Sequence, residues 1–239
     1  MKKKLLYLSY FITIFIVTVV LSFPYTTCVQ YYINSFIKRN HLRCSYKHIH
    51  STVCKTDIKN IKIALVNGKD LTINNMMVSY NPFTLFLDKK VSVAIEDPFI
   101  KMKLYVSPKS FVCRGRILAD LLNSYMPYHI SGDVYMDGRY RLNRETGYIK
   151  ATSPKLTIKY NGNTIQLTSI RARLKIVKNQ IIIKRIASTG QPSINLKGEI
   201  ILNRNKPSSS PLHIKGVLHN RQLKFPFDIS GTLAHITFD

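Results

Sequence analysis

Apolar side chains follow three different patterns along this chain of 239 residues. Residues 5–23 form one long apolar run. Over residues 24–42 the apolar positions recur at three- and four-residue steps, the period of an amphipathic helix. Beyond them apolar side chains alternate with polar or basic ones, segment after segment, which is the period of a half-buried strand. The pattern predicts a mainly β protein, in which an N-terminal transmembrane helix precedes an elongated antiparallel β-sheet.

The first segment has the length of a membrane span. Three lysines precede the apolar run, which extends from Leu5 to Phe23 and ends at Pro24. A helix rises about 1.5 Å per residue, so the run covers a hydrocarbon core roughly 30 Å thick. The segment lacks both the shorter apolar core and the small-residue cleavage site of a removed signal peptide. We therefore expect residues 1–23 to be a cytoplasmic tip followed by a transmembrane signal anchor.

The second segment, residues 24–42, predicts a juxtamembrane amphipathic helix at the membrane surface. Its apolar stripe consists of Val29, Tyr32, Ile33, Phe36 and Ile37. Residues 43–239 are expected to form one β domain outside the cytoplasm, because a long downstream domain is translocated largely regardless of its charge. In a Gram-negative cell, this arrangement places a single-pass protein in the inner membrane with most of its chain in the periplasm.

Within the β domain, the alternation separates an apolar face from a face rich in Lys and Arg. A sheet with one apolar face must cover it with itself, with a partner protein or with a lipid. The pattern leaves open whether the sheet is an open groove or a flattened barrel with a closed core. The apolar positions expected to line this face are Ile100, Met102, Leu104, Leu156, Ile158, Ile170, Leu174, Ile176, Leu196, Ile200, Ile214 and Leu218.

Residues 117–125 are the exception to the alternation. Ile117, Leu118, Leu121 and Leu122 have helical spacing, which predicts one short helix inside the β domain. The polar stretch of residues 203–211 is rich in Ser and Pro and predicts a long hairpin loop. It is too short to separate two domains.

Glycine recurs in a fixed apolar-x-Gly-x-apolar frame. The four glycines are Gly132, Gly198, Gly216 and Gly231. Because Gly weakens the interior of a strand, its repeated use indicates a bend, a bulge or the close approach of another backbone or a ligand. These positions predict a strongly curved sheet, with ordinary bulges in a packed sandwich as the alternative.

The charge of the chain points to anionic partners. Lys and Arg number 36 against 12 Asp and Glu, a formal net charge of +24. Such a balance predicts attraction to nucleic acid, to phosphate-rich lipid headgroups or to lipopolysaccharide. The predicted anchor argues against nucleic acid, because a periplasmic domain rarely meets it. We expect the membrane and no nucleic acid among the partners.

Catalytic and metal-binding patterns are missing from the sequence. It contains no Gly-x-Ser-x-Gly, no phosphate-binding Gly loop and no His-Glu-x-x-His, so we expect no enzyme, no metal site and no cofactor. The 4 cysteines fit an oxidising compartment but show no Cys-x-x-Cys spacing. Cys44 and Cys54 flank a short basic segment and are the candidate disulfide pair.

The sequence resembles the GspN family, the N component of bacterial type II secretion. The resemblance rests on the anchor, the chain length, the predicted internal helix before residues 130–134 (ISGDV) and the terminal motif of residues 227–233 (FDISGTL). It implies a non-enzymatic secretion component that pairs with other envelope proteins. The strand-Gly-strand units also resemble AsmA-like, lipid-bridging proteins, which implies the alternative of a periplasmic lipid-binding or lipid-transfer protein.

Overall fold

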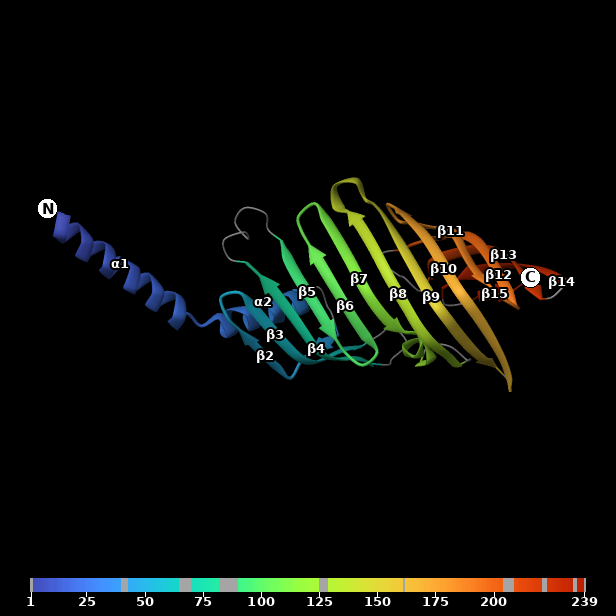
Figure 1. The fold of residues 1–239 in the computed structure, drawn as a ribbon, viewed down its shortest axis with the longest axis horizontal. Helices are drawn as coiled ribbons and strands as arrows, with labels where there is room; N and C mark the ends of the chain where they lie inside the picture. Colours follow the sequence, from blue (N-terminus) through green and yellow to red (C-terminus); the bar gives the residue numbers. More distant parts are fainter. Residues whose placement is uncertain are drawn as a thin grey trace.

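A computed structural model describes residues 2–39, 43–64, 70–81, 90–124, 129–160, 162–203, 209–220, 223–233 and 236–238. Its strands join in one antiparallel sheet, preceded by two α-helices (Figure 1). The elements are α1 (Lys2–Ser22), α2 (Tyr25–Arg39), β1 (Cys44–Ser45), β2 (His48–Ser51), β3 (Lys55–Ala64), β4 (Asp70–Tyr80), β5 (Val91–Glu96), β6 (Ile100–Val106), β7 (Ser110–Leu118), the 3₁₀ turn η1 (Ala119–Ser124), β8 (His129–Arg141), the 3₁₀ turn η2 (Leu142–Arg144), β9 (Thr146–Tyr160), β10 (Asn163–Val177), β11 (Gln180–Thr189), β12 (Ser193–Ile201), β13 (Pro211–Asn220), β14 (Leu223–Thr232) and β15 (Ile236–Phe238).

The topology is an antiparallel meander. From β3 to β15 each strand pairs with the strand that follows it in sequence, while β1 and β2 both pair with β3. No strand of the described residues joins the two ends of this order, so the sheet is open. The prediction of a mainly β protein with a large antiparallel sheet is confirmed, and the open form replaces the flattened barrel.

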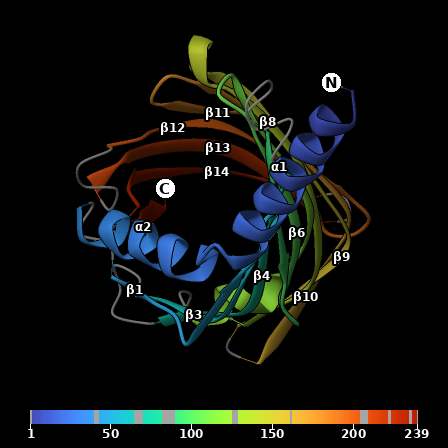
Figure 2. The ribbon, with the colours of Figure 1, turned by 90° about the vertical axis from the view of Figure 1, so that its left-hand side faces the viewer.

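The sheet curls about its long axis. Figure 2 shows the strands curling around the long axis, with α2 lying on the inner side of the curl near the N-terminal end. The side chain of Ile33 on α2 packs against a buried cluster of Ile49, Ile58, Ile61 and Ile73 from β2, β3 and β4. These apolar side chains therefore face the concave side of the sheet. The charged side chains that alternate with them face the convex side.

The predicted internal helix is corrected by the structure. Ile117 and Leu118 belong to the end of β7, where Ile117 pairs with Ile100 on one side and with Val134 on the other. Only Ala119–Ser124 turns, and it does so as a 3₁₀ segment that lies against β8. The prediction was wrong because Ile117 and Leu118, the last two residues of β7, are followed directly by a turn that also contains apolar residues. Together the strand end and the turn imitate the spacing of one helix.

Two helices lead into the sheet. By itself, neither helix passes as a membrane span over the described residues, but Tyr10–Val20 and Tyr25–Arg39 pass together as a pair bent by 47°. α2 covers Tyr25–Arg39 of the segment predicted to be an amphipathic helix, and the side chains of its apolar stripe have two kinds of surroundings. Ile33 packs on the sheet, whereas Tyr32 and Phe36 are 74% and 61% exposed.

Candidate functional site: the concave apolar face

The concave face carries an unbroken row of apolar or small residues across the sheet. Residues directly opposite each other in an antiparallel pair point to the same face. Beginning on β4, successive partners are Val78, Val93, Leu104, Cys113, Gly138, Ile149, Leu174, Ile183, Gly198, Ile214, Ile229 and Phe238. No charged residue interrupts the row from β4 to β15.

Parallel rows flank this one on both sides. One contains Met76, Ile95, Met102, Gly115, Met136, Ala151, Ala172, Ile186, Leu196, Gly216 and Phe227. The other contains Tyr80, Val91, Val106, Phe111, Tyr140, Gly147, Ile176, Ile181, Ile200, Leu212, Gly231 and Ile236. Together the rows make a band that follows the long axis of the sheet.

The residues predicted for the apolar face lie in or beside this band. Met102, Leu104, Leu174, Ile176, Leu196, Ile200 and Ile214 belong to its three rows, and Ile100 and Leu218 lie at its margins. Leu156, Ile158 and Ile170 lie toward the far ends of β9 and β10, where the pairing of β8 with β9 and of β10 with β11 shifts register.

Burial within the band is incomplete. Of these twelve side chains only Ile100 and Ile170 are buried, at 8% exposure each, and the other ten are half-buried. A sealed core would bury nearly all of them, because interiors are close-packed. In an uncovered, curved sheet, each side chain is shielded from water only by its neighbours on the same face, which leaves it half-buried.

The cover over the concave face is confined to one end. α2 packs on β2 at the N-terminal end of the sheet, and η1 lies against β8. Thr26 of α2 fixes the helix there, since its Oγ1 accepts a hydrogen bond from the Ser51 backbone N–H at 3.0 Å. From β9 to β15 no helix among the described elements packs on the sheet. Among the described residues, the helical elements therefore contact the sheet mainly at β2 and β8, and we call the apolar concave face the concave groove.

The four glycines singled out by the sequence lie at distortions or close contacts of the sheet. Gly132 and Gly231 have φ angles of +135° and +116°, in the region that side chains rarely adopt. Gly132 stands where the pairing of β8 with β9 shifts register. A Cβ atom on Gly198 would overlap the His213 carbonyl oxygen, and one on Gly216 would meet the Phe227 ring. Such positions let neighbouring strands approach closely while the sheet bends.

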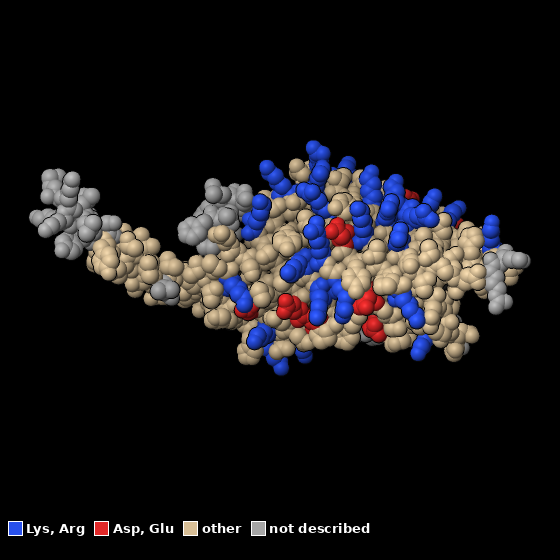
Figure 3. Space-filling view, in the orientation of Figure 1, with Lys and Arg blue, Asp and Glu red and all other residues tan. Residues whose placement is uncertain are grey.

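The convex face is basic (Figure 3). Along one row, Lys103, Arg114, Asp137, Lys150, Arg173 and Arg185 lie side by side on successive strands. Arg114 is paired with Asp137 at 2.9 Å between Nε and Oδ2. Lys150 and Arg173, however, lie directly opposite each other, and like charges in that position are unfavourable. This face is therefore suited to anions and not to an apolar ligand.

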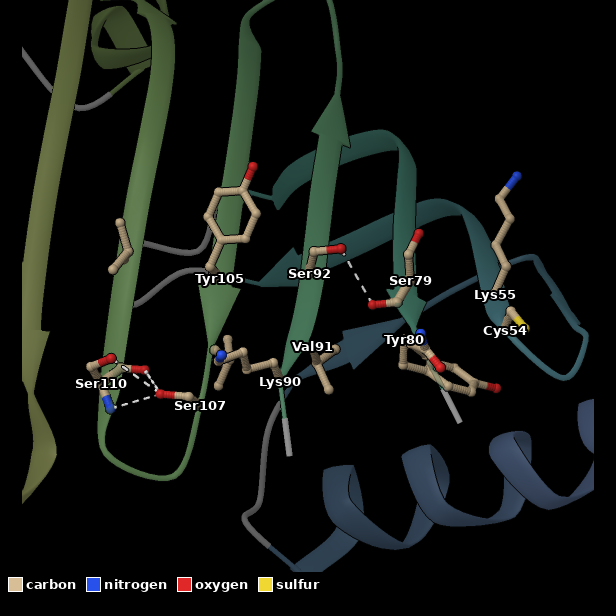
Figure 4. Close-up of a pocket in the computed structure, with 13 residues that line it drawn as sticks. Cys54, Lys55, Ser79, Tyr80, Lys90, Val91, Ser92, Tyr105, Ser107 and Ser110 are labelled. Atoms are coloured by element: carbon tan, nitrogen blue, oxygen red, sulfur yellow. Dashed lines mark hydrogen bonds between the residues drawn. The ribbon is translucent and has the colours of Figure 1, made fainter. Parts of the chain in front are cut away.

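A cavity of about 780 Å³ lies at the rim of the sheet, where β4 and β6 end and β5 and β7 begin (Figure 4). Its walls include Tyr80, Val91, Tyr105, Val106 and Val112. Sequence reasoning missed this cavity, because it is formed by strand ends that only the pairing of four strands brings together. No pattern within one strand could have indicated it.

The candidate disulfide is not formed in this structure, and the described cysteines are all free. Cys44 pairs with Ile63 near the end of β3, whereas Cys54 directly precedes the start of that strand. Nine residues separate Cys54 from Ile63, about 30 Å in an extended strand, and a disulfide needs Cα atoms less than about 7 Å apart. The predicted pair was wrong because the two cysteines, although close in sequence, lie at opposite ends of β3.

Among the described residues, no group of three or more His, Cys, Asp or Glu side chains is placed to hold a metal ion.

Comparisons with protein-family models, curated proteins and solved structures gave no match to this chain. What the protein does must therefore be argued from its geometry. The feature that dominates this geometry is the open apolar groove backed by a basic convex face.

Proposed function

We propose that the protein binds lipid acyl chains in its concave groove, as a non-enzymatic lipid-binding or lipid-transfer protein of AsmA-like type. The observation that carries the proposal is the apolar band of three rows, which is continuous from β4 to β14 and mostly half-buried. Apolar surface in contact with water costs about 25 cal/mol per Å². A ligand with long apolar chains relieves that cost along the whole band.

The dimensions of the groove support this occupant. Strands lie about 4.8 Å apart, so the path from β4 to β14 is roughly 48 Å long. One acyl chain spans about half of a bilayer core of roughly 30 Å. The groove therefore has room for more than one chain end to end, which suits a conduit for lipids better than a pocket for one small molecule.

The N-terminal helices support a place at the membrane. α2 exposes Tyr31 and Tyr32 away from the sheet, and Lys38 and Arg39 end the helix. Exposed aromatic and basic side chains are typical of the membrane–water interface. In the proposed arrangement α1 anchors the chain in a bacterial inner membrane, α2 lies at the surface, and the groove extends from there into the periplasm.

The test is to purify the full chain in a mild detergent and to measure co-purified lipid by mass spectrometry. Wild type should retain lipid, and Leu174→Glu should retain several-fold less, because a carboxylate in the central row repels acyl chains. Arg173→Glu is the matched control, since it introduces the same group on the same strand but on the convex face. It should retain as much lipid as wild type.

Circular dichroism of each variant separates loss of binding from loss of folding. A folded Leu174→Glu chain without lipid supports the groove. If wild type holds no lipid and Leu174→Glu simply unfolds, the concave face is a core and the proposal is wrong.

A second candidate function is that of a GspN-like component of type II secretion that pairs with other envelope proteins. The observation that favours it is the outer edge of β14, where β15 pairs only with Ile229, Ser230 and Gly231 among the described residues. Leu223 and Phe225 on the same strand are 62% and 47% exposed. An open edge of this kind accepts an added strand from a partner.

Cross-linking in the native membrane tests this second function. A photoreactive side chain at Lys224 should capture an envelope protein, whereas one at Lys197 in the sheet interior should not. Capture of the same proteins at both positions contradicts strand addition at β14.

A further inference from the structure

Two adjoining hollows at one rim of the sheet are lined by cationic side chains. One, of about 230 Å³, is lined by Lys109, Arg139, Arg141 and Arg144 among others. The next, of about 320 Å³, shares Arg139 and Arg141 and adds Lys175. Arg139 and Lys175 both lie opposite Tyr148, so this part of the rim belongs to the convex face. Five cations thus surround two connected hollows.

No ion pair among the described residues neutralises these cations. No carboxylate side chain lines either hollow, and none of the five cations forms an ion pair with another described residue. By contrast, Arg114 and Arg116 on the neighbouring strand pair with Asp137 and Asp133 at 2.9 and 3.3 Å. Collecting like charges around a hollow is unfavourable unless an anion occupies it.

The chemistry of the lining fits a phosphate group. Guanidinium groups donate two parallel hydrogen bonds to phosphate oxygens, and Arg139 and Arg141 border both hollows. Thr146 and Tyr148 line the larger hollow and carry hydroxyl groups that are further donors.

The apolar cavity of about 780 Å³ adjoins this basic site. Ser110 lines both that cavity and the smaller basic hollow. The junction is held by the turn between β6 and β7, in which the Ser110 backbone N–H donates to Ser107 Oγ at 3.1 Å. Tyr105, Val106 and Val112 line the apolar cavity, and Lys109 and Arg139 line the basic hollow. The volume of the cavity is in the range of known small-molecule sites.

We propose that this rim binds an anionic amphiphile: a phosphate monoester held by Arg139 and Arg141, with an acyl chain in the cavity beside Tyr105 and Val112. The charged part of the site opens on the convex face, whereas its apolar cavity also borders the concave band at Tyr80, Val91 and Val106. An apolar hollow and a cationic hollow that share one residue match the two ends of such a molecule. Neither end alone accounts for both hollows.

The experiment uses the full chain in mild detergent and a photoreactive lysophosphatidic acid with a diazirine in its acyl chain. Mass spectrometry should locate the label between residues 105 and 112. Replacing Arg139 and Arg141 together by Gln should lower this labelling at least about tenfold, since each lost contact is a charge-assisted hydrogen bond. Excess unlabelled lysophosphatidic acid should compete, whereas lysophosphatidylcholine with the same chain should compete far less.

The matched control replaces Arg173 and Arg185 together by Gln, which removes the same charge from the same face. It should leave labelling at residues 105–112 unchanged, and both double variants should melt at the wild-type temperature. Equal loss in the control shows general attraction to a basic surface and overturns the site. Labelling confined to residues of the concave band outside the range 105–112 also overturns it. Competition by inorganic phosphate as strong as by lysophosphatidic acid overturns the assignment of the apolar cavity.

Discussion

Gly138 lies directly opposite Cys113 across the β7–β8 pair, and a Cβ atom at Gly138 would stand 2.8 Å from Cys113 Sγ. The two residues are neighbours in the central row of the concave band. Their contact shows how closely adjacent strands are fitted on this face. It also provides a sensitive point from which to test the groove.

We expect Gly138→Ala to destabilise the protein by about 1–3 kcal/mol, because the added methyl group overpacks against the Cys113 sulfur. In the Cys113→Ala background the same change should cost at least about 0.5 kcal/mol less, since the obstructing atom is gone. Thermal melting of wild type, Gly138→Ala, Cys113→Ala and the double variant measures this coupling energy. Gly198→Ala is the comparison: its clash is with the His213 backbone, which no side-chain truncation removes. Strict additivity of the Gly138 and Cys113 changes would contradict the contact.

The thiol of Cys113 should report occupancy of the groove. Burial raises its pKa above the ordinary value, the charge of Asp137 adds to the rise, and backbone hydrogen bonds oppose it. Since the thiolate is the reactive form, alkylation should require a higher pH than for an ordinary thiol. Added lipid should slow it further by covering the sulfur. Mass spectrometry after brief maleimide treatment measures both effects, and the exposed Cys54 in the same chain is the control for the effect of pH.

The same pKa shift has a consequence for stability. The folded chain keeps the Cys113 proton to a higher pH than the unfolded chain does. This contribution is fully present below the pKa of an ordinary thiol and is lost as the pH rises through the raised folded value. Cys113→Ser should therefore flatten the fall in melting temperature on the alkaline side. An unchanged alkaline profile would count against a buried thiol at this position.

Ile33→Asp should release α2 from the sheet. The Ile33 side chain packs on the buried cluster of Ile49, Ile58, Ile61 and Ile73, and a charge there would be desolvated without a partner. Hydrogen exchange of the α2 amides should rise at least about tenfold, while the strands from β9 onward stay protected. Tyr32→Asp is the control, because Tyr32 points away from the sheet and is 74% exposed. Similar exchange in both variants would show that α2 is not held by Ile33.

Arg114→Gln should change stability by less than about 1 kcal/mol, although its Nε lies 2.9 Å from Asp137. Both side chains are largely exposed, at 69% and 42%, so water and salt screen the pair. Thermal melting at low and at high salt measures this effect. The difference in melting temperature between wild type and variant should shrink at high salt. A loss of several kcal/mol would show that the convex face is buried against something in the folded protein.

Local alternation predicted the strands well. β6 and β12 follow the apolar and polar periods of their residues, and Met102, Leu104 and Leu196 lie in the concave band. The prediction was wrong where a strand pattern and a helical pattern overlap, as at Ile117 and Leu118, which extend β7 although their spacing is helical. It failed again for Cys44 and Cys54, because closeness in sequence says nothing about the width of the strand between them.

The rim site lay beyond sequence reasoning for a related cause. Tyr105, Ser110 and Arg139 belong to different strands, and only their register brings them to one edge. Basic residues occur along much of the convex face, so charge alone did not distinguish Arg139 and Arg141 from Arg114. The difference lies in partners: Asp137 is opposite Arg114, and no carboxylate lines the hollows beside Arg139.

By itself, the sequence determined that the chain forms a one-faced antiparallel sheet after an apolar N-terminal segment, because side-chain alternation requires no knowledge of distant contacts. Tertiary structure decided that the sheet stays open, that α2 packs on one end of it, and that the apolar face is concave. These properties depend on small rotations between strands, added over the whole sheet and adjusted at positions such as Gly132 and Gly198. Such a sum is not encoded in any one segment.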